Sequence, residues 1–124
     1  MTGKPLYNWE AFTRAKRLWR EARHMVITPF DVTNAIWEKK YGKKYDVYRD
    51  KVEYGSDVML DAWLGDTRVL LWADAIALLP EWETSRGSRI EVQTAILFGK
   101  RIFEAFTFKE LKLSAVVQFV QEAT

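Results

Sequence analysis

The chain contains no cysteine and only one histidine, His24, among its 124 residues. Without thiols, a disulfide framework and a thiolate metal site are excluded, and a single histidine excludes a multi-histidine metal centre. Long apolar runs are missing as well, so no segment has the length of a membrane span. The chain does not open with the basic and apolar segments of a signal peptide. We therefore expect a soluble cytoplasmic protein that uses no metal and no cofactor.

An excess of charge is missing too. Nineteen Lys and Arg residues oppose 17 Asp and Glu residues, which gives a net charge of +2. This is too weak to argue for nucleic acid or a membrane surface as a partner. One helical face is basic, but such a face is more often solvated than bound to phosphate; it carries Arg14, Lys16, Arg17, Arg20 and Arg23. We expect no nucleic-acid partner.

Aromatic residues, in contrast, are abundant at 15%, with six Trp. Most of these Trp residues are expected in the core or on half-buried surface, and some are expected to line a pocket or an interface. The length fits one domain over residues 1–124.

The first half of the chain predicts one helix, one strand and an irregular segment. Asn8 is a good N-cap for a helix with apolar residues at helical spacing. Met25 to Thr28 reads as a short strand that Pro29 ends. The polar segment from Asn34 to Glu53 reads as an irregular excursion with at most a short helical piece.

The second half predicts a regular alternation. A helix over Ser56 to Trp72 precedes a strand over Ala75 to Leu79, and a helix over Gly87 to Phe98 precedes a strand over Arg101 to Phe106. A last amphipathic helix is expected from Lys109 to Gln121. Alternation of helices and strands indicates an α/β fold with a parallel sheet and crossover helices. Such a fold is a small three-layer sandwich of Rossmann or flavodoxin type.

Sheets of this type bind ligands beyond the carboxyl ends of their strands. This rule places three segments along one rim, namely residues 28–31, 80–87 and 104–107. Pro29 and Asp31 in the first segment are therefore candidates for contact with a ligand.

Glu91 in the second rim segment has two interpretations. Ser88-Arg89-Ile90-Glu91 matches the S-x-x-E capping box, in which Ser88 accepts from the Glu91 amide and Glu91 accepts from the Ser88 amide. In the functional interpretation, the small-residue loop and the helix start form an anion site. Ser85, Gly87 and Ser88 would then hold a phosphate or ribose, and Arg86 and Arg89 would add positive charge.

In this second interpretation Glu91 acts as a nucleophile at an anomeric carbon. A second carboxylate then assists the departure of the leaving base. Asp66, eight residues before Asp74, is the candidate for that second role. In the non-functional interpretation, Asp66 is a solvated aspartate on a helix. In the same interpretation, Asp74 is only a helix cap or the start of the strand.

Four motifs resemble the nucleoside 2-deoxyribosyltransferase-like superfamily, above all its short branch common in phage genomes. TGKPLYNWEAF from Thr2 is similar to the end of its G-P-x-T-G loop and the start of its first helix, and VITPFD is similar to its second strand. The pattern D-(x)7-D-A-I-A-L-L-P-x-W from Asp66 is similar to its third-strand signature. SRGSRIE followed by AILFGKRI, from Ser85, is similar to its S-x-G-x-x-x-E…A…G-K-P-V signature.

The resemblance implies an enzyme that cleaves or transfers the N-glycosidic bond of a 2-deoxyribonucleoside or its 5′-monophosphate. Glu91 would attack C1′, Asp66 would be the supporting acid, and Ser85 and Gly87 would hold the phosphate or sugar. Further substrate-contact candidates are Thr2, Gly3, Tyr7, Arg86 and Ser88. Relatives of this kind form homo-oligomers, and so a dimer or larger assembly is expected.

The chain departs from the family pattern at its start. The family's first strand and its Gly-Pro are absent before Thr2-Gly3. We expect either a start upstream of Met1 or a smaller sheet that lacks this strand. The alternatives to an enzyme are a catalytically weak protein that binds or sequesters nucleotides, and an interaction protein that uses the basic face and the Trp residues.

Overall fold

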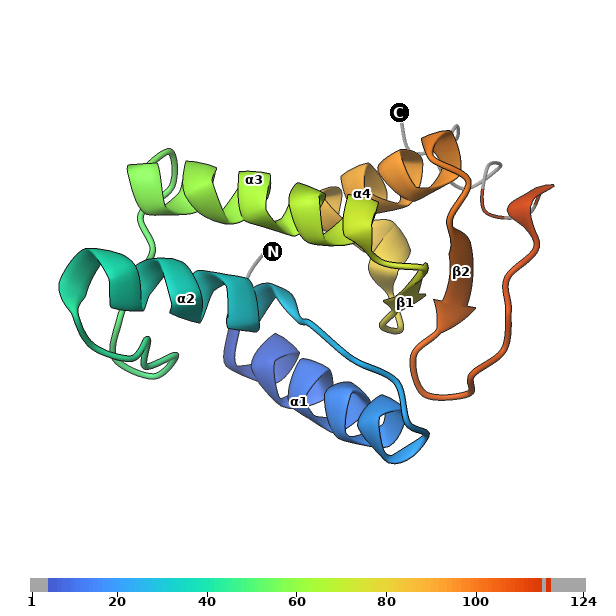
Figure 1. Ribbon diagram of the computed structural model, residues 1–124, viewed down its shortest axis with the longest axis horizontal. Helices are drawn as coiled ribbons and strands as arrows, with labels where there is room; N and C mark the ends of the chain where they lie inside the picture. Colours follow the sequence, from blue (N-terminus) through green and yellow to red (C-terminus); the bar gives the residue numbers. More distant parts are fainter. Residues whose placement is uncertain (1–4, 115, 117–124) are drawn as a thin grey trace. The chain divides into compact units, whose positions relative to one another are not determined.

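The computed structural model describes residues 5–114 and 116, with the backbone alone for residues 5–8. Figure 1 shows the elements in chain order. They are α1 (Pro5–Glu21), α2 (Pro29–Tyr41), α3 (Asp57–Trp72), β1 (Ala75–Leu78), the 3-10 helix η1 (Trp82–Thr84), α4 (Arg86–Leu97) and β2 (Arg101–Glu104).

Of the described residues, 5–69 form one compact unit, the N-terminal unit, and the rest form a second, the C-terminal unit. The boundary between them falls within α3. That residues 1–124 form one domain stays a prediction. Within the described residues, no helix combines the length and the apolar character needed to cross a membrane.

The first helix begins earlier than predicted. α1 starts at Pro5, whereas the sequence pattern placed an N-cap at Asn8. Proline is well suited to the first position of a helix, because its fixed φ is helical and the amide it lacks has no partner there. Ala15 is buried, and the Phe12 ring lies 5.7 Å from the Phe30 ring of α2, so the predicted apolar side of this helix does pack inward.

The strand predicted over Met25 to Thr28 is wrong. Thr28 is instead the N-cap of α2, and Pro29 occupies the first turn of that helix. The Thr28 hydroxyl accepts from the Asp31 amide at 3.2 Å, and the Asp31 carboxylate accepts from the Thr28 amide at 2.8 Å. Proline therefore starts a helix here rather than ending a strand. The predicted irregular excursion is also partly wrong, since α2 extends to Tyr41.

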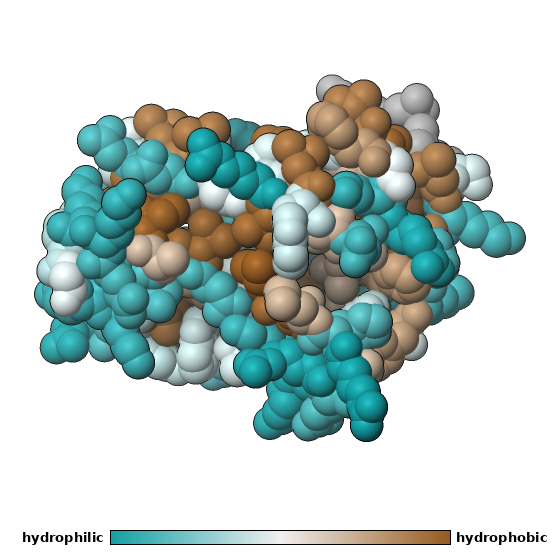
Figure 2. Space-filling view, in the orientation of Figure 1, coloured by the Kyte–Doolittle hydropathy of each residue, from teal (hydrophilic) through white to brown (hydrophobic). Residues whose placement is uncertain are grey.

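The helix predicted over Ser56 to Trp72 is confirmed as α3. Its inward positions include Val58, Ala62 and Leu70, all buried. Two tryptophans of the same helix are not buried, since Trp63 is 51% exposed and Trp72 is 67% exposed. Figure 2 shows apolar residues, in brown, at the surface beside the charged ones.

Gly65 has a packing role that the sequence pattern did not reveal. It lies in α3, where glycine is a poor helix former. A Cβ at this position would lie 2.7 Å from Cγ1 of Val32 in α2. The missing side chain thus allows α3 and α2 to approach closely within the N-terminal unit.

The C-terminal unit contains a β-α-β unit, and the predicted parallel sheet is confirmed. β1 pairs with β2 in parallel, in a register that runs from Ala75 opposite Arg101 to Leu78 opposite Glu104. α4 connects the two strands and packs against both. Val92 and Ala95 of α4 are fully buried, in a core cluster with Leu78 and Ile102 of the strands. The chain therefore has the mixed α/β, Rossmann-like fold class.

The turn after α4 is formed around Gly99. Gly99 has a φ of +69°, which glycine adopts at little cost. Its amide donates to the Ile96 carbonyl at 3.1 Å, and the Lys100 amide donates to Ala95 at 2.8 Å. These bonds end the helix and lead directly into β2.

The last predicted helix does not begin at Lys109. Residues 109–111 instead run along β2, where the Glu104 amide donates to the Lys109 carbonyl and the Leu111 amide donates to the Ile102 carbonyl, both at 2.8 Å. Arg101 and Glu110 add an exposed ion pair at 2.6 Å. The main part of the predicted helix, residues 115 and 117–121, lies outside the described residues.

Replacement of Gly65 by alanine tests the helix approach. Alanine is the better helix former by about 1 kcal/mol. The clash with Val32, whose branched side chain is stiff, costs about 1–3 kcal/mol. We therefore expect Gly65→Ala to lower the urea midpoint of unfolding. The matched control is Gly87→Ala, where an added Cβ meets nothing within 4 Å. A higher midpoint for Gly65→Ala than for the wild type would contradict the packing role.

Candidate functional site

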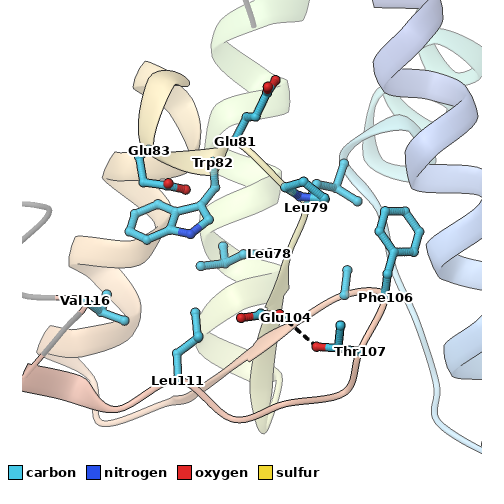
Figure 3. Close-up of a pocket in the computed structure, with 12 residues that line it drawn as sticks. Leu78, Leu79, Glu81, Trp82, Glu83, Glu104, Phe106, Thr107, Leu111 and Val116 are labelled. Atoms are coloured by element: carbon cyan, nitrogen blue, oxygen red, sulfur yellow. Dashed lines mark hydrogen bonds between the residues drawn. The ribbon is translucent and has the colours of Figure 1, made fainter.

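A pocket lies at the carboxyl ends of the two parallel strands. It encloses about 380 Å³ and is formed within the C-terminal unit (Figure 3). One side comes from residues 78–83, at and after the end of β1, the other from residues 104–107, at and after the end of β2, and Leu111 and Val116 complete it. Of the rim expected from the sequence, residues 80–83 and 104–107 line this pocket, whereas residues 84–87 are not among its lining residues. The third segment, residues 28–31, belongs to the N-terminal unit.

The pocket wall is acidic and aromatic. Three carboxylates line it, from Glu81, Glu83 and Glu104, and the described lining holds no lysine or arginine. The Trp82 ring packs against the core cluster and also lines the pocket. The Thr107 hydroxyl donates to Glu104 Oε2 at 2.8 Å, which orients that carboxylate. Glu81 has a φ of +67°, an uncommon conformation for a residue with a Cβ.

Sequence reasoning did not single out Glu83, Trp82 or Glu104 as site residues. The available signal was the rule that ligands bind beyond strand ends. That rule selected the segments that follow β1 and β2. Which of their side chains lie opposite one another depends on the register in which the two strands pair. Among the described residues, no group of three or more His, Cys, Asp or Glu side chains is arranged to hold a metal.

The start of α4 differs from the predicted capping box. Ser85, not Ser88, is the N-cap, and its hydroxyl accepts from the Ser88 amide at 3.3 Å. Ser85 is selected because η1 ends just before it and leaves its backbone extended, with φ −96° and ψ 119°. Arg86 and Gly87 therefore occupy the first turn, where helix amides have no carbonyl partner within the helix. The capping interpretation of Glu91 is wrong.

Glu91 lies in the second turn of α4, immediately before the fully buried Val92. Its side chain is half-buried, and burial raises its pKa to about 7. A carboxylate with a pKa near neutral is the kind of group that enzymes use for proton transfer or nucleophilic attack. Glu91 is not among the residues that line the pocket.

Asp66, the predicted partner of Glu91, lies in the part of α3 that belongs to the N-terminal unit. Its side chain is half-buried, and its Oδ1 atom is buried. Asp74 is exposed directly before β1. Because the two carboxylates belong to different units, the pairing of Asp66 with Glu91 stays a prediction.

The remaining candidates lie in or before the N-terminal unit. Thr2 and Gly3 are outside the described residues, and Tyr7 belongs to the first turns of α1. Pro29 occupies the first turn of α2. Asp31 forms an ion pair with Lys16 of α1, with both carboxylate oxygens within 2.9 Å of Nζ.

Asp31 also borders a second cavity of about 480 Å³, which lies within the N-terminal unit. Burial on its own would raise the pKa of Asp31. The bonds from Lys16 and Thr28 outweigh it, and the pKa is lowered from 3.8. Asp31 thus has a structural role at the junction of α1 and α2, whatever it contacts in that cavity.

The Asp31 ion pair makes stability depend on pH. Because the folded-state pKa lies below the unfolded value, the contribution is present above that value and is lost as the pH falls through the folded pKa. We expect Asp31→Asn to lower the free energy of unfolding by about 0.5–1.5 kcal/mol at pH 7. The deficit should shrink below pH 3.8. Urea titrations at pH 7 and at a pH below 3.8 measure this difference in the free energy of unfolding, with the exposed substitution Asp61→Asn as control. An equal deficit at both pH values would refute this role.

The raised pKa of Glu91 predicts that stability depends on pH in the opposite direction. Its folded-state pKa of about 7 exceeds the usual glutamate value of 4.5, so ionisation opposes folding and stability falls as the pH rises between these values. We expect Glu91→Gln to be more stable than the wild type at pH 8, by about 1–3 kcal/mol, and to show little difference at pH 4. Urea unfolding measures this, with exposed Glu53→Gln as the charge control. A loss of stability at pH 8 would show that Glu91 has a structural role.

Comparison with known proteins supplies the family. No curated protein and no solved structure matches the chain. One protein family matches residues 1–104, a range that includes all the helices and strands from α1 to β2. The chain belongs to this family, which is described as a domain of unknown function, DUF4406.

Proposed function

We propose that this protein cleaves or transfers the N-glycosidic bond of a 2-deoxyribonucleotide, with Glu91 as the nucleophile. The proposal extends the motif resemblance to the nucleoside 2-deoxyribosyltransferase-like superfamily. One observation carries it: Glu91 has no capping role in α4, yet it is held half-buried with a pKa raised to about 7. Burying an ionisable carboxylate costs free energy, which a functional role accounts for.

In the proposed reaction, the Glu91 carboxylate attacks C1′ of the deoxyribose. The bond between C1′ and the base nitrogen breaks, its electron pair leaves with the base, and Asp66 supplies a proton to the base. The resulting glycosyl ester is then attacked at C1′ by water or by a second base, and Glu91 is released as a carboxylate. A buried carboxylate suits this role because it stabilises the positive charge that develops at C1′.

The start of α4 supports a place for the phosphate or sugar. Its first turn presents the amides of Arg86 and Gly87, and the helix dipole favours negative charge there. The exposed Arg86 side chain adds positive charge. The pocket beyond β1 and β2 is acidic, so the phosphate would not be placed in it.

We further propose that the protein works as a homo-oligomer in the cytoplasm, where nucleotides are available. Exposed aromatic residues in and after α2 support a contact with a second copy, since such residues are enriched in interfaces. Tyr41, Tyr48 and Tyr54 are 50%, 64% and 84% exposed.

A second candidate function is nucleotide binding without turnover. It is favoured by the position of Glu91 outside the lining of the pocket. In that case the protein would hold or sequester a nucleotide, and Glu91 would not be required for binding.

Base release separates the two functions. We expect the wild type to liberate free base from at least one 2-deoxynucleoside 5′-monophosphate, as followed by chromatography. Glu91→Gln should lose about 100-fold or more of this activity, because an amide is a poor nucleophile. Glu53→Gln, an exposed substitution of the same chemistry, should retain it. Addition of a second base tests for transfer.

The pH dependence identifies the role of Glu91. A nucleophile must be ionised, so kcat/KM should rise with pH and level off above a pKa of about 7. Activity that instead falls as the pH rises through 7 would make Glu91 a general acid. Absence of base release from a folded protein that still binds nucleotide would favour the binding function.

A further inference from the structure

The pocket beyond β1 and β2 has the size of a small-molecule site. Its volume of about 380 Å³ falls within the roughly 300–1,000 Å³ typical of such sites. Its apolar floor includes Leu78, Leu111 and Val116. The Trp82 ring packs against the core cluster and lines the pocket, so an aromatic group is available to a ligand there. These features favour a flat, mainly apolar ligand.

The charge of the pocket lining further restricts the chemical class of ligand that would bind. An ionised carboxylate only accepts hydrogen bonds, so Glu83 and Glu104 require donors on the ligand. With no basic residue in the described lining, an anionic group would meet repulsion. Figure 3 shows the carboxylates of Glu83, in η1, and Glu104, at the end of β2, with Leu78 between them, while the carboxylate of Glu81 points away.

We propose that this pocket binds the nucleobase and selects bases that carry an amino group. The Trp82 ring would contact the base, and Glu83 and Glu104 would accept hydrogen bonds from its amino group and ring N–H groups. The inference rests on the proposed function in taking the ligand to be a nucleotide, and it adds the class of base.

The chemistry of the bases supplies the selection. Adenine and cytosine present an amino group where thymine and uracil present the O4 carbonyl. A carbonyl oxygen placed against a carboxylate leaves two acceptors facing each other, and both lose their hydrogen bonds to water. Glu104 is already oriented by the Thr107 hydroxyl on Oε2. Its carboxylate therefore needs little ordering when a ligand binds.

Binding of free bases tests the inference without requiring catalysis. Adenine, cytosine, thymine and uracil are titrated into the protein at pH 7.5, and binding is followed by ligand-observed NMR. We expect saturable binding of adenine and cytosine, with thymine and uracil weaker by about tenfold or more, the cost of an unmet hydrogen bond to a charged group.

Two variants and two controls sharpen the test. Glu83→Gln and Glu104→Gln should each reduce the preference for amino-bearing bases by about tenfold, because a glutamine amide also donates to a carbonyl. Glu53→Gln, exposed and outside the pocket, should leave it unchanged. Butylammonium, an amine without a ring, should not compete with adenine. Circular dichroism shows that each variant is folded.

Three results would overturn the inference: no saturable binding of any base, equal binding of thymine and adenine, or a preference unaffected by both glutamine variants. Its failure is distinct from that of the proposed function. If amino-bearing bases bind selectively but no nucleotide is cleaved, the pocket inference stands and the enzyme proposal fails. If base release depends on Glu91 but Glu83 and Glu104 do not select the base, the enzyme proposal stands and the pocket inference fails.

Discussion

The parallel pairing of β1 with β2 is the constraint on which the C-terminal unit depends. Parallel neighbours require a crossover, and α4 supplies it by packing Val92 and Ala95 against both strands. The same pairing brings the carboxyl ends of the strands to one edge. Glu83 and Glu104 thus line one pocket although they are far apart in the chain. Candidate chemistry in this unit follows from a backbone arrangement rather than from a local motif.

The position at which α4 begins has a comparable effect on Glu91. With Ser85 as N-cap, the helix start is satisfied without Glu91, which lies one turn further along beside the buried core. Had Ser88 been the cap, Glu91 would have faced solvent at the helix start and met an amide there. A three-residue difference in register separates a stabilising cap from a half-buried carboxylate whose pKa is raised to about 7. The free-energy cost of holding Glu91 there supports the role proposed for it.

The sequence pattern predicted the second half of the chain better than the first. The elements α3, β1, α4 and β2 all follow a strong periodicity of apolar residues. The start of α1 and the first part of α2 differ from the prediction, because Pro5 and Pro29 begin helices in this chain. Proline is compatible both with the end of a strand and with the first turn of a helix. At Pro29, only the hydrogen bonds around Thr28 distinguish these two cases.

Local spacing and composition were enough to predict the α/β class and the parallel strands, and to single out Glu91 and residues 80–83 and 104–107 of the rim. The folded structure was needed to show which serine caps α4, how close α2 comes to Gly65, and that Trp82, Glu83 and Glu104 share one pocket. The physical reason is that burial and facing arise from contacts between segments distant in the chain. A raised pKa for Glu91 likewise comes from packed neighbours that no local pattern encodes.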